Sequence, residues 1–168
     1  MAGRISIINS SVHSDKAFKA LSAELKLMYF QLLSHPQGNK AGFFQIDTEY
    51  MADIMCRCSE TEVFERLTTP TTLWQYDPST DVVLIPNYLK YNKIGGVKTF
   101  TSMRYELEQL PKTTLCVEFI YRLNQYTDGK AIPFLPKSMV ETAKATIASK
   151  KELTVHDSIV NRLLTLNS

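Results

Sequence analysis

The chain has 168 residues, of which 44% are hydrophobic and 21% are charged. These values are ordinary for a globular domain and exclude a mainly disordered, collagen-like or coiled-coil chain. There is no run of about 18 apolar residues, which argues against a transmembrane helix. The three cysteines form no paired pattern, as expected in a reducing cytoplasm, and a formal net charge of only +2 identifies no partner.

Charge is distributed unevenly along the chain. Residues 41–81 carry eight acidic and two basic side chains, whereas residues 82–151 carry eleven basic and five acidic ones. The first 40 residues are also basic, with five bases and two acids. An acidic middle therefore lies between basic flanks, and charges within about 8–10 Å of one another act together on a partner.

Helical spacing and turn signals predict a helix, a strand and a second helix in the first third of the chain. Apolar residues between 20 and 34 form one stripe with Ser22 as a plausible N-cap, and Pro36 opposes continuation of this helix. A short strand is expected at 42–46. Asp47 caps the next helix, which is expected to run to about Arg57.

The following segment predicts a third helix and a β-hairpin. Ser59 and Glu62 match the capping box, so this helix begins after Ser59 and ends before Pro70. Two β-rich runs, 74–76 and 82–85, flank turn-forming residues and predict the hairpin. The order helix, strand, helix, helix, hairpin is that of a winged helix-turn-helix domain. Residues expected to be buried here are Phe43, Val63, Phe64, Leu67 and Trp74.

The rest of the chain is expected to be helical. Helices are predicted at 101–110 and 114–126, and the glycine and prolines of 128–136 predict an exposed linker. Two further helices are expected at 138–151 and 156–166. The apolar face of the last one is expected to carry Ile159, Leu163 and Leu166.

The expected fold class is therefore α+β, mainly α: a winged helix-turn-helix with a C-terminal helical extension. Residues 1–100 form the winged-helix domain with an N-terminal arm, and residues 101–127 are additional helices packed on it. Residues 128–168 form the linker and a helical tail.

Signatures of common catalytic and metal sites are missing from the sequence. Cys56 and Cys58 are separated by a single residue and have no second pair, whereas structural zinc needs four ligands at wider spacing. Gly95-Gly96 lacks the Gly-Lys-Ser/Thr that completes a phosphate-binding loop. No Ser/His/Asp or Cys/His signature is recognisable. We therefore expect a protein that is not an enzyme and holds no metal or cofactor.

The residues after the predicted hairpin combine basic and aromatic side chains, which suits nucleic acid. Lys and Arg neutralise phosphates, and exposed aromatic rings stack on unpaired bases. The predicted third helix is acidic, so we expect the wing and its basic flank to bind duplex or single-stranded DNA more than this helix does. The candidate DNA-binding residues are Lys90, Tyr91, Asn92, Lys93, Lys98, Arg104, Arg66, Lys16 and Lys19.

Four stretches within residues 20–92 form a recognisable pattern: Leu21–Glu24, Leu27–Leu33, Ala41–Phe44 and, most tellingly, Val83–Asn92. With them, residues 20–92 resemble the N-terminal winged-helix domain of phage replication-initiation proteins. These replisome organisers are related in design to DnaD-like helicase-loading proteins. It implies a protein of the bacterial host cytoplasm that binds origin DNA, self-associates and recruits the host replicative helicase or its loader. The resemblance assigns no DNA contact to any single residue.

Two other functions fit the same features. A winged-helix transcriptional regulator would bind a palindromic operator. A protein-interaction module, such as an inhibitor of a host nucleic-acid machine, would use the acidic surface of residues 47–65 to imitate a phosphate array and would bind no DNA.

Overall fold

The computed structural model describes residues 8, 10–55 and 58–166, and over these the chain is mainly helical with one small antiparallel sheet. The α+β, mainly α class expected from the sequence is confirmed. The first half contains η1 (Ser10–Ser14), α1 (Lys16–Lys19), α2 (Ala23–Ser34), β1 (Phe43–Gln45), α3 (Thr48–Ile54), α4 (Glu60–Thr68), β2 (Gln75–Asp77), β3 (Val82–Leu84) and α5 (Tyr88–Tyr91). The second half contains α6 (Val97–Glu108), α7 (Cys116–Thr127), η2 (Ile132–Phe134), α8 (Lys137–Ala148) and α9 (Val155–Leu166).

Three helices begin where the sequence predicts, because a side chain satisfies backbone amides that lack a partner within the helix. Ser22 caps α2 and Asp47 caps α3. The capping box of α4 is complete: Ser59 Oγ accepts from the Glu62 amide at 3.2 Å, and Glu62 Oε2 accepts from the Ser59 amide at 2.7 Å. The expected end of the second helix, Arg57, lies outside the described residues.

The sheet has the strand order β1-β3-β2, with β3 antiparallel to both neighbours. Val83 stands opposite Phe44 in one ladder and opposite Tyr76 in the other. The predicted hairpin is therefore confirmed as β2 and β3. Phe43 and Trp74 are almost fully buried, as expected, although Trp74 precedes β2 and is not part of it.

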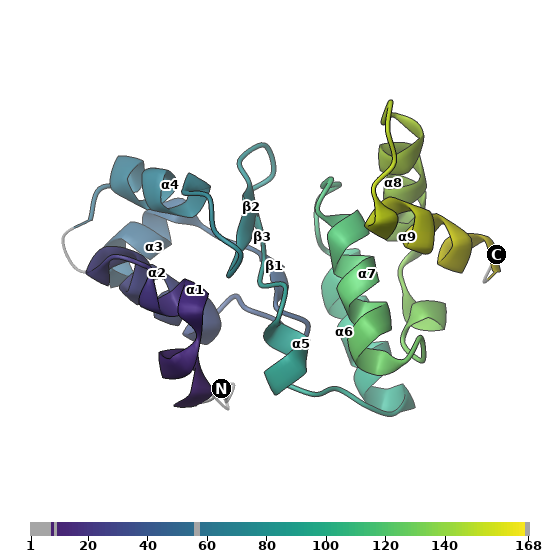
Figure 1. Cartoon of the computed structure of the whole chain (residues 1–168), viewed down its shortest axis with the longest axis horizontal. Coiled ribbons are helices and arrows are strands. Elements are labelled where there is room, and N and C mark those ends of the chain that lie inside the picture. The colour runs from purple at the N-terminus through teal and green to yellow at the C-terminus, as the bar shows by residue number, and fades with distance from the viewer. Residues whose placement is uncertain (1–7, 9, 56–57, 167–168) are drawn as a thin grey trace.

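Helices cover both sides of the sheet. Figure 1 shows the sheet between α1–α4 on one side and α6–α9 on the other. Phe43 of β1 stacks on Phe119 of α7 with ring centroids 4.6 Å apart, so α7 packs directly against the sheet. All three residues of β3 are buried. The core is thus continuous from α2 through the sheet to α7.

The expectation that Phe64 is buried is wrong. Helix α4 turns Val63 and Leu67 into the core, and both are almost fully buried. Phe64, one position further round the helix, keeps 44% of its surface exposed. Around the helix Phe64 lies about 100° from Val63 and about 60° from Leu67, on the side away from Val63, and this position leaves the ring partly at the surface.

The buried face of α9 also differs from the expected one. Asp157, Val160 and Leu164 are buried, whereas Leu166 is exposed. Asp157 lies inside because it is satisfied there: its Oδ1 accepts from Lys150 Nζ at 2.6 Å. Its Oδ2 accepts from the amide and the hydroxyl of Thr154, both at 2.8 Å.

The segment 128–136 is not the uniformly exposed linker that its composition predicts. Ala131, Ile132 and Leu135 are buried. The helix before this segment, α7, packs against both helices after it, α8 and α9. Residues 137–166 are therefore part of the same packed body as α7.

Candidate nucleic-acid interface

Three of the predicted DNA-binding lysines follow one edge of the molecule. Lys90 is in α5, Lys93 is in the connection after it, Lys98 is in the first turn of α6, and all three are exposed. In Figure 1, α5 and this connection form the lower edge, at the opposite end of the sheet from the β2–β3 turn. Residues 82–105 contain no acidic side chain. This edge is therefore positive and free of carboxylates from its own segment.

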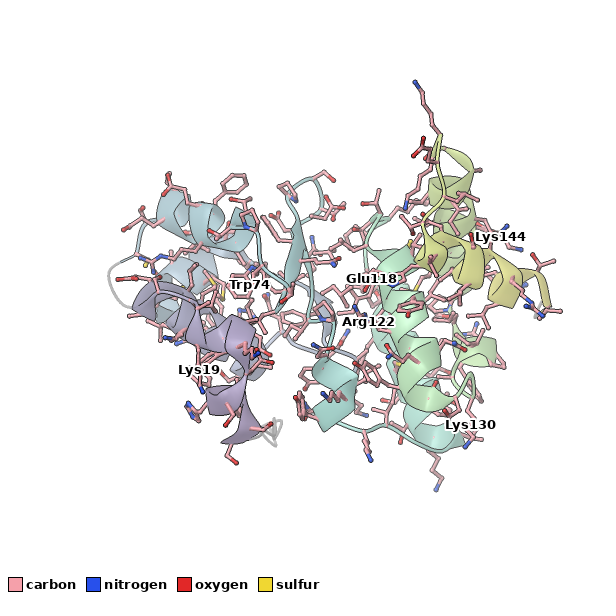
Figure 2. All side chains as sticks on the ribbon, viewed as in Figure 1. Lys19, Trp74, Glu118, Arg122, Lys130 and Lys144 are labelled. Atoms are coloured by element: carbon pink, nitrogen blue, oxygen red, sulfur yellow. The ribbon has the colours of Figure 1, made fainter. Side chains whose placement is uncertain are left out.

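Helix α1 lies beside this edge and brings Lys16 and Lys19, which are both exposed. Asp15, the N-cap of α1, lines a small cavity of about 30 Å3 together with Tyr91 and Asn92 at the end of α5. Figure 2 shows Lys19 in the lower part of the molecule. We call the exposed lysines of α1, α5 and residues 92–98 the basic end; they are Lys16, Lys19, Lys90, Lys93 and Lys98.

Tyr91 and Asn92 are turned partly inward. Both line the cavity beside α1, and Asn92 Nδ2 donates to the Tyr88 carbonyl at 3.3 Å. Lys90 Nζ lies 5.3 Å from the centroid of the Tyr91 ring. The Tyr91 ring therefore lies beside the Lys90 ammonium, and the Asn92 side chain is hydrogen-bonded to the backbone of α5.

Arg104 lies apart from the basic end. It is six residues after Lys98 in α6, which places the two side chains about 120° apart around the helix. Arg104 Nε lies 2.8 Å from Glu108 Oε1, so its charge is compensated by an ion pair. It lines a different cleft, of about 430 Å3, together with Lys137 and Lys144.

Arg66 also makes contacts with side chains near it in sequence. Its Nη1 donates to Cys58 Sγ at 2.8 Å, and its Nη2 lies 3.9 Å from Glu62 Oε1. Hydrogen bonds from the Ser59 amide and hydroxyl lower the pKa of Glu62, so this carboxylate is ionised at neutral pH. Arg66 is partly buried and is the single basic residue of α4.

Helices α3 and α4 and the β2–β3 hairpin carry acidic side chains instead. Within the described residues this region, which we call the acidic end, has one basic residue, Arg66. Figure 1 shows α4 and the hairpin turn at the far side of the molecule from α5. The sequence predicts basic residues beside the hairpin; in the structure they follow the end of β3 and lie away from the hairpin turn (Figure 1). The acidic residues concerned are Glu49, Asp53, Glu60, Glu62, Glu65, Asp77 and Asp81.

A polar network that the sequence does not predict joins α7 and α9. Glu118 Oε1 lies 2.7 Å from Arg122 Nε, and Glu118 Oε2 lies 2.6 Å from His156 Nδ1. The His156 ring stacks on Tyr121 with centroids 3.7 Å apart. Figure 2 labels Glu118 and Arg122 on α7. His156 is 38 residues from Glu118, so the local sequence pattern does not predict this contact. The contact holds α9 against α7.

The structure offers no metal centre within the residues that it describes. None of their His, Cys, Asp and Glu side chains form a group of three or more suited to holding an ion. Of the Cys-x-Cys pair, Cys58 is a thiol that accepts from Arg66, and Cys56 lies outside the described residues.

Comparison of the chain with protein-family models, curated proteins and solved structures finds no match. Among residues 8, 10–55 and 58–166, no helix has the length and apolar character needed to span a membrane.

Proposed function

We propose that residues 20–92 are a winged-helix domain. Helices α2, α3 and α4 correspond to the three helices of such a domain, and the β2–β3 hairpin corresponds to its wing. The proposal is supported by the strand order β1-β3-β2, in which the strand before the helix pair adds to the hairpin. It is also supported by the direct contact between α3 and α4.

In this proposal the domain is part of a DNA-binding protein that acts in the initiation of phage-type DNA replication. The resemblance of residues 20–92 to replisome organisers favours origin binding, self-association and recruitment of a host replicative helicase or its loader. One observation carries the DNA-binding part: Lys90, Lys93 and Lys98 of the basic end are exposed in a segment, residues 82–105, without acidic residues, whereas α4 is acidic. Phosphates are therefore bound at the basic end and repelled by the face that a winged helix ordinarily turns to the major groove.

A salt series tests this proposal. Binding of labelled duplex and single-stranded DNA is measured between about 50 and 200 mM salt for the parent and for the variant Lys90→Gln/Lys93→Gln/Lys98→Gln. The variant should bind all sequences more weakly, and the slope of log affinity against log salt should flatten by up to about three units, roughly one per lost phosphate contact. The matched control, Lys112→Gln/Lys137→Gln/Lys151→Gln, removes the same charge from exposed positions outside the basic end.

Three results would count against the proposal. Equal losses in the two triple variants would mean that DNA responds only to net charge. Loss of binding in Arg66→Ala with none in the basic-end variant would make α4 the DNA-contacting helix. Tight binding of one palindromic duplex, with little affinity for other DNA, would favour a transcriptional regulator.

A second candidate function, a protein-interaction module, is favoured by the acidic end itself. Glu60, Glu62 and Glu65 are exposed on α4, and the aromatic ring of Phe64 is exposed among them. Such a surface suits a basic protein, since opposite potentials steer partners together. The two functions use opposite ends of the molecule and can coexist.

A further inference from the structure

The acidic end contains a shallow open cleft of about 410 Å3, where the start of α4 faces the β2–β3 hairpin. Phe64 of α4 and Tyr76 of β2 form part of its lining, together with Pro78 of the hairpin turn. Two carboxylates also line it, Glu60 in the first turn of α4 and Asp81 at the end of the hairpin turn, and the remaining lining comes from Thr48 and Thr61. The cleft therefore combines aromatic and negatively charged groups in one hollow.

The two aromatic rings are arranged edge to face. Their centroids are 6.2 Å apart and their planes are inclined at 82°. Phe64 contributes little hydrophobic stabilisation to the core in this position, because 44% of its surface stays exposed. Aromatic faces attract cations, and the attraction is strongest for a cation that is partly removed from water, as in a cleft.

The carboxylate of Asp81 is held in place by local structure. Asp81 adopts the left-handed region with φ of 54°, which Asp tolerates better than most residues. In that conformation its Oδ1 accepts from the Tyr76 hydroxyl at 2.5 Å, so the carboxylate and the ring form one unit. Glu60 is exposed at the other side of the cleft.

The charged side chains that line the cleft disfavour an anion, because both are carboxylates. No Lys or Arg lines the cleft. Arg66, the nearest basic residue along α4, is directed to Cys58 and Glu62. A phosphate would therefore meet carboxylates and ring faces with no cation to compensate it. A positively charged group would be attracted by both the carboxylates and the aromatic ring faces.

We propose that this cleft binds an arginine side chain presented by a basic segment of a protein partner. A guanidinium is planar, so it stacks on an aromatic ring while its N–H groups donate to carboxylates on either side. A lysine ammonium is more strongly hydrated and does not stack, so it binds the same cleft less well. The inference rests on the second candidate function, in which the acidic end contacts a protein.

The test uses the full chain and two probes, the blocked peptides (Gly-Arg)4 and (Gly-Lys)4, which carry equal charge. Affinity is measured by fluorescence anisotropy at about 0.15 M salt, and NMR follows the ring protons of Tyr76. Glu60→Gln and Phe64→Ala should each weaken the arginine peptide by about fivefold, the size expected from one ion or cation–π contact in a half-open site. The arginine peptide should bind several-fold more tightly than the lysine peptide, and the Tyr76 signals should shift on binding.

Matched controls exist for both variants. Glu152→Gln removes an exposed carboxylate outside the acidic end, and Leu27→Ala truncates a side chain of α2 that is 44% exposed, as Phe64 is. Both should bind within about twofold of the parent, and melting curves of all four variants should overlay that of the parent.

The inference is overturned if Glu152→Gln weakens binding as much as Glu60→Gln, since the peptide would then respond only to net charge. It is also overturned if the two peptides bind equally, which would leave the acidic end as a general contact for basic proteins. If neither peptide binds at all, the second candidate function fails together with the cleft.

Discussion

Replacing His35 by Asn should remove most of the pH dependence of stability between pH 7 and pH 5. His35 follows the last residue of α2 and is only 2% exposed, with its ring stacked on Phe44 and edge-on to Tyr50. Its Nδ1 accepts from the Gln37 amide at 3.2 Å, which puts the proton of the neutral ring on Nε2. Burial lowers the pKa of His35 to about 4, against which Asp47 acts only in part.

The sign and size of the effect follow from this pKa. An unfolded chain has a histidine pKa of about 6.5, so between pH 6.5 and 4 the unfolded state binds more protons than the folded state. The contribution of His35 is therefore complete above about pH 6.5 and is lost as the pH falls towards 4. A difference of roughly 2.5 units gives a loss of about 2 kcal/mol between pH 7 and pH 5.

The assay is urea unfolding at pH 7, 6 and 5, followed by the fluorescence of Trp74, the single tryptophan of the chain. Asn at position 35 keeps an oxygen that can accept from the Gln37 amide but does not titrate. His35→Asn starts less stable because ring contacts are lost, yet its stability should change little between pH 7 and 5. His13→Gln, at an exposed position, should keep the slope of the parent. A full drop of about 2 kcal/mol in His35→Asn would refute the assignment.

Three further predictions concern stability and are checked by thermal and urea unfolding. Trp74→Ala should cost about 3–5 kcal/mol, because the indole is buried and its Nε1 donates to the Leu67 carbonyl at 3.0 Å; melting like the parent would contradict this burial. Gly42→Ala should cost about 2 kcal/mol or more, because Gly42 has φ of +66° and an added Cβ would lie 2.4 Å from Tyr88 Cβ; an unchanged midpoint would mean that Tyr88 can move away. Ser59→Ala should cost about 1 kcal/mol through loss of the capping box, whereas Ser59→Asp should retain most of the stability; no loss in Ser59→Ala would show that the cap contributes nothing.

Local signals predicted the elements well where the interaction that makes them is itself local. The capping box at Ser59 and the β2–β3 hairpin depend on residues close in sequence, and both form as expected. The burial of Phe64 was not predictable from its hydrophobicity, because the orientation of α4 is set by Val63 and Leu67 against the rest of the core.

Contacts between distant parts of the chain account for what the sequence did not reveal. Asp157 is buried on the inner face of α9 because Lys150 and Thr154 donate hydrogen bonds to its carboxylate. Hydropathy alone would assign a carboxylate to the surface. The separation of the basic end from the hairpin turn has a similar origin. Lys90 follows the hairpin closely in sequence, but β3 carries the chain to the other end of the sheet before α5 begins.

The central position of β3 has a consequence for amide hydrogen exchange. Its backbone is paired on both sides, and Val82, Val83 and Leu84 are buried beneath helices from both halves of the chain. Solvent reaches these amides only when the whole body opens, so their exchange rates report the global free energy of unfolding. The α1 amides, in a four-residue helix at the periphery, exchange through local fraying. Comparing the two sets separates loss of the N-terminal arm from unfolding of the protein.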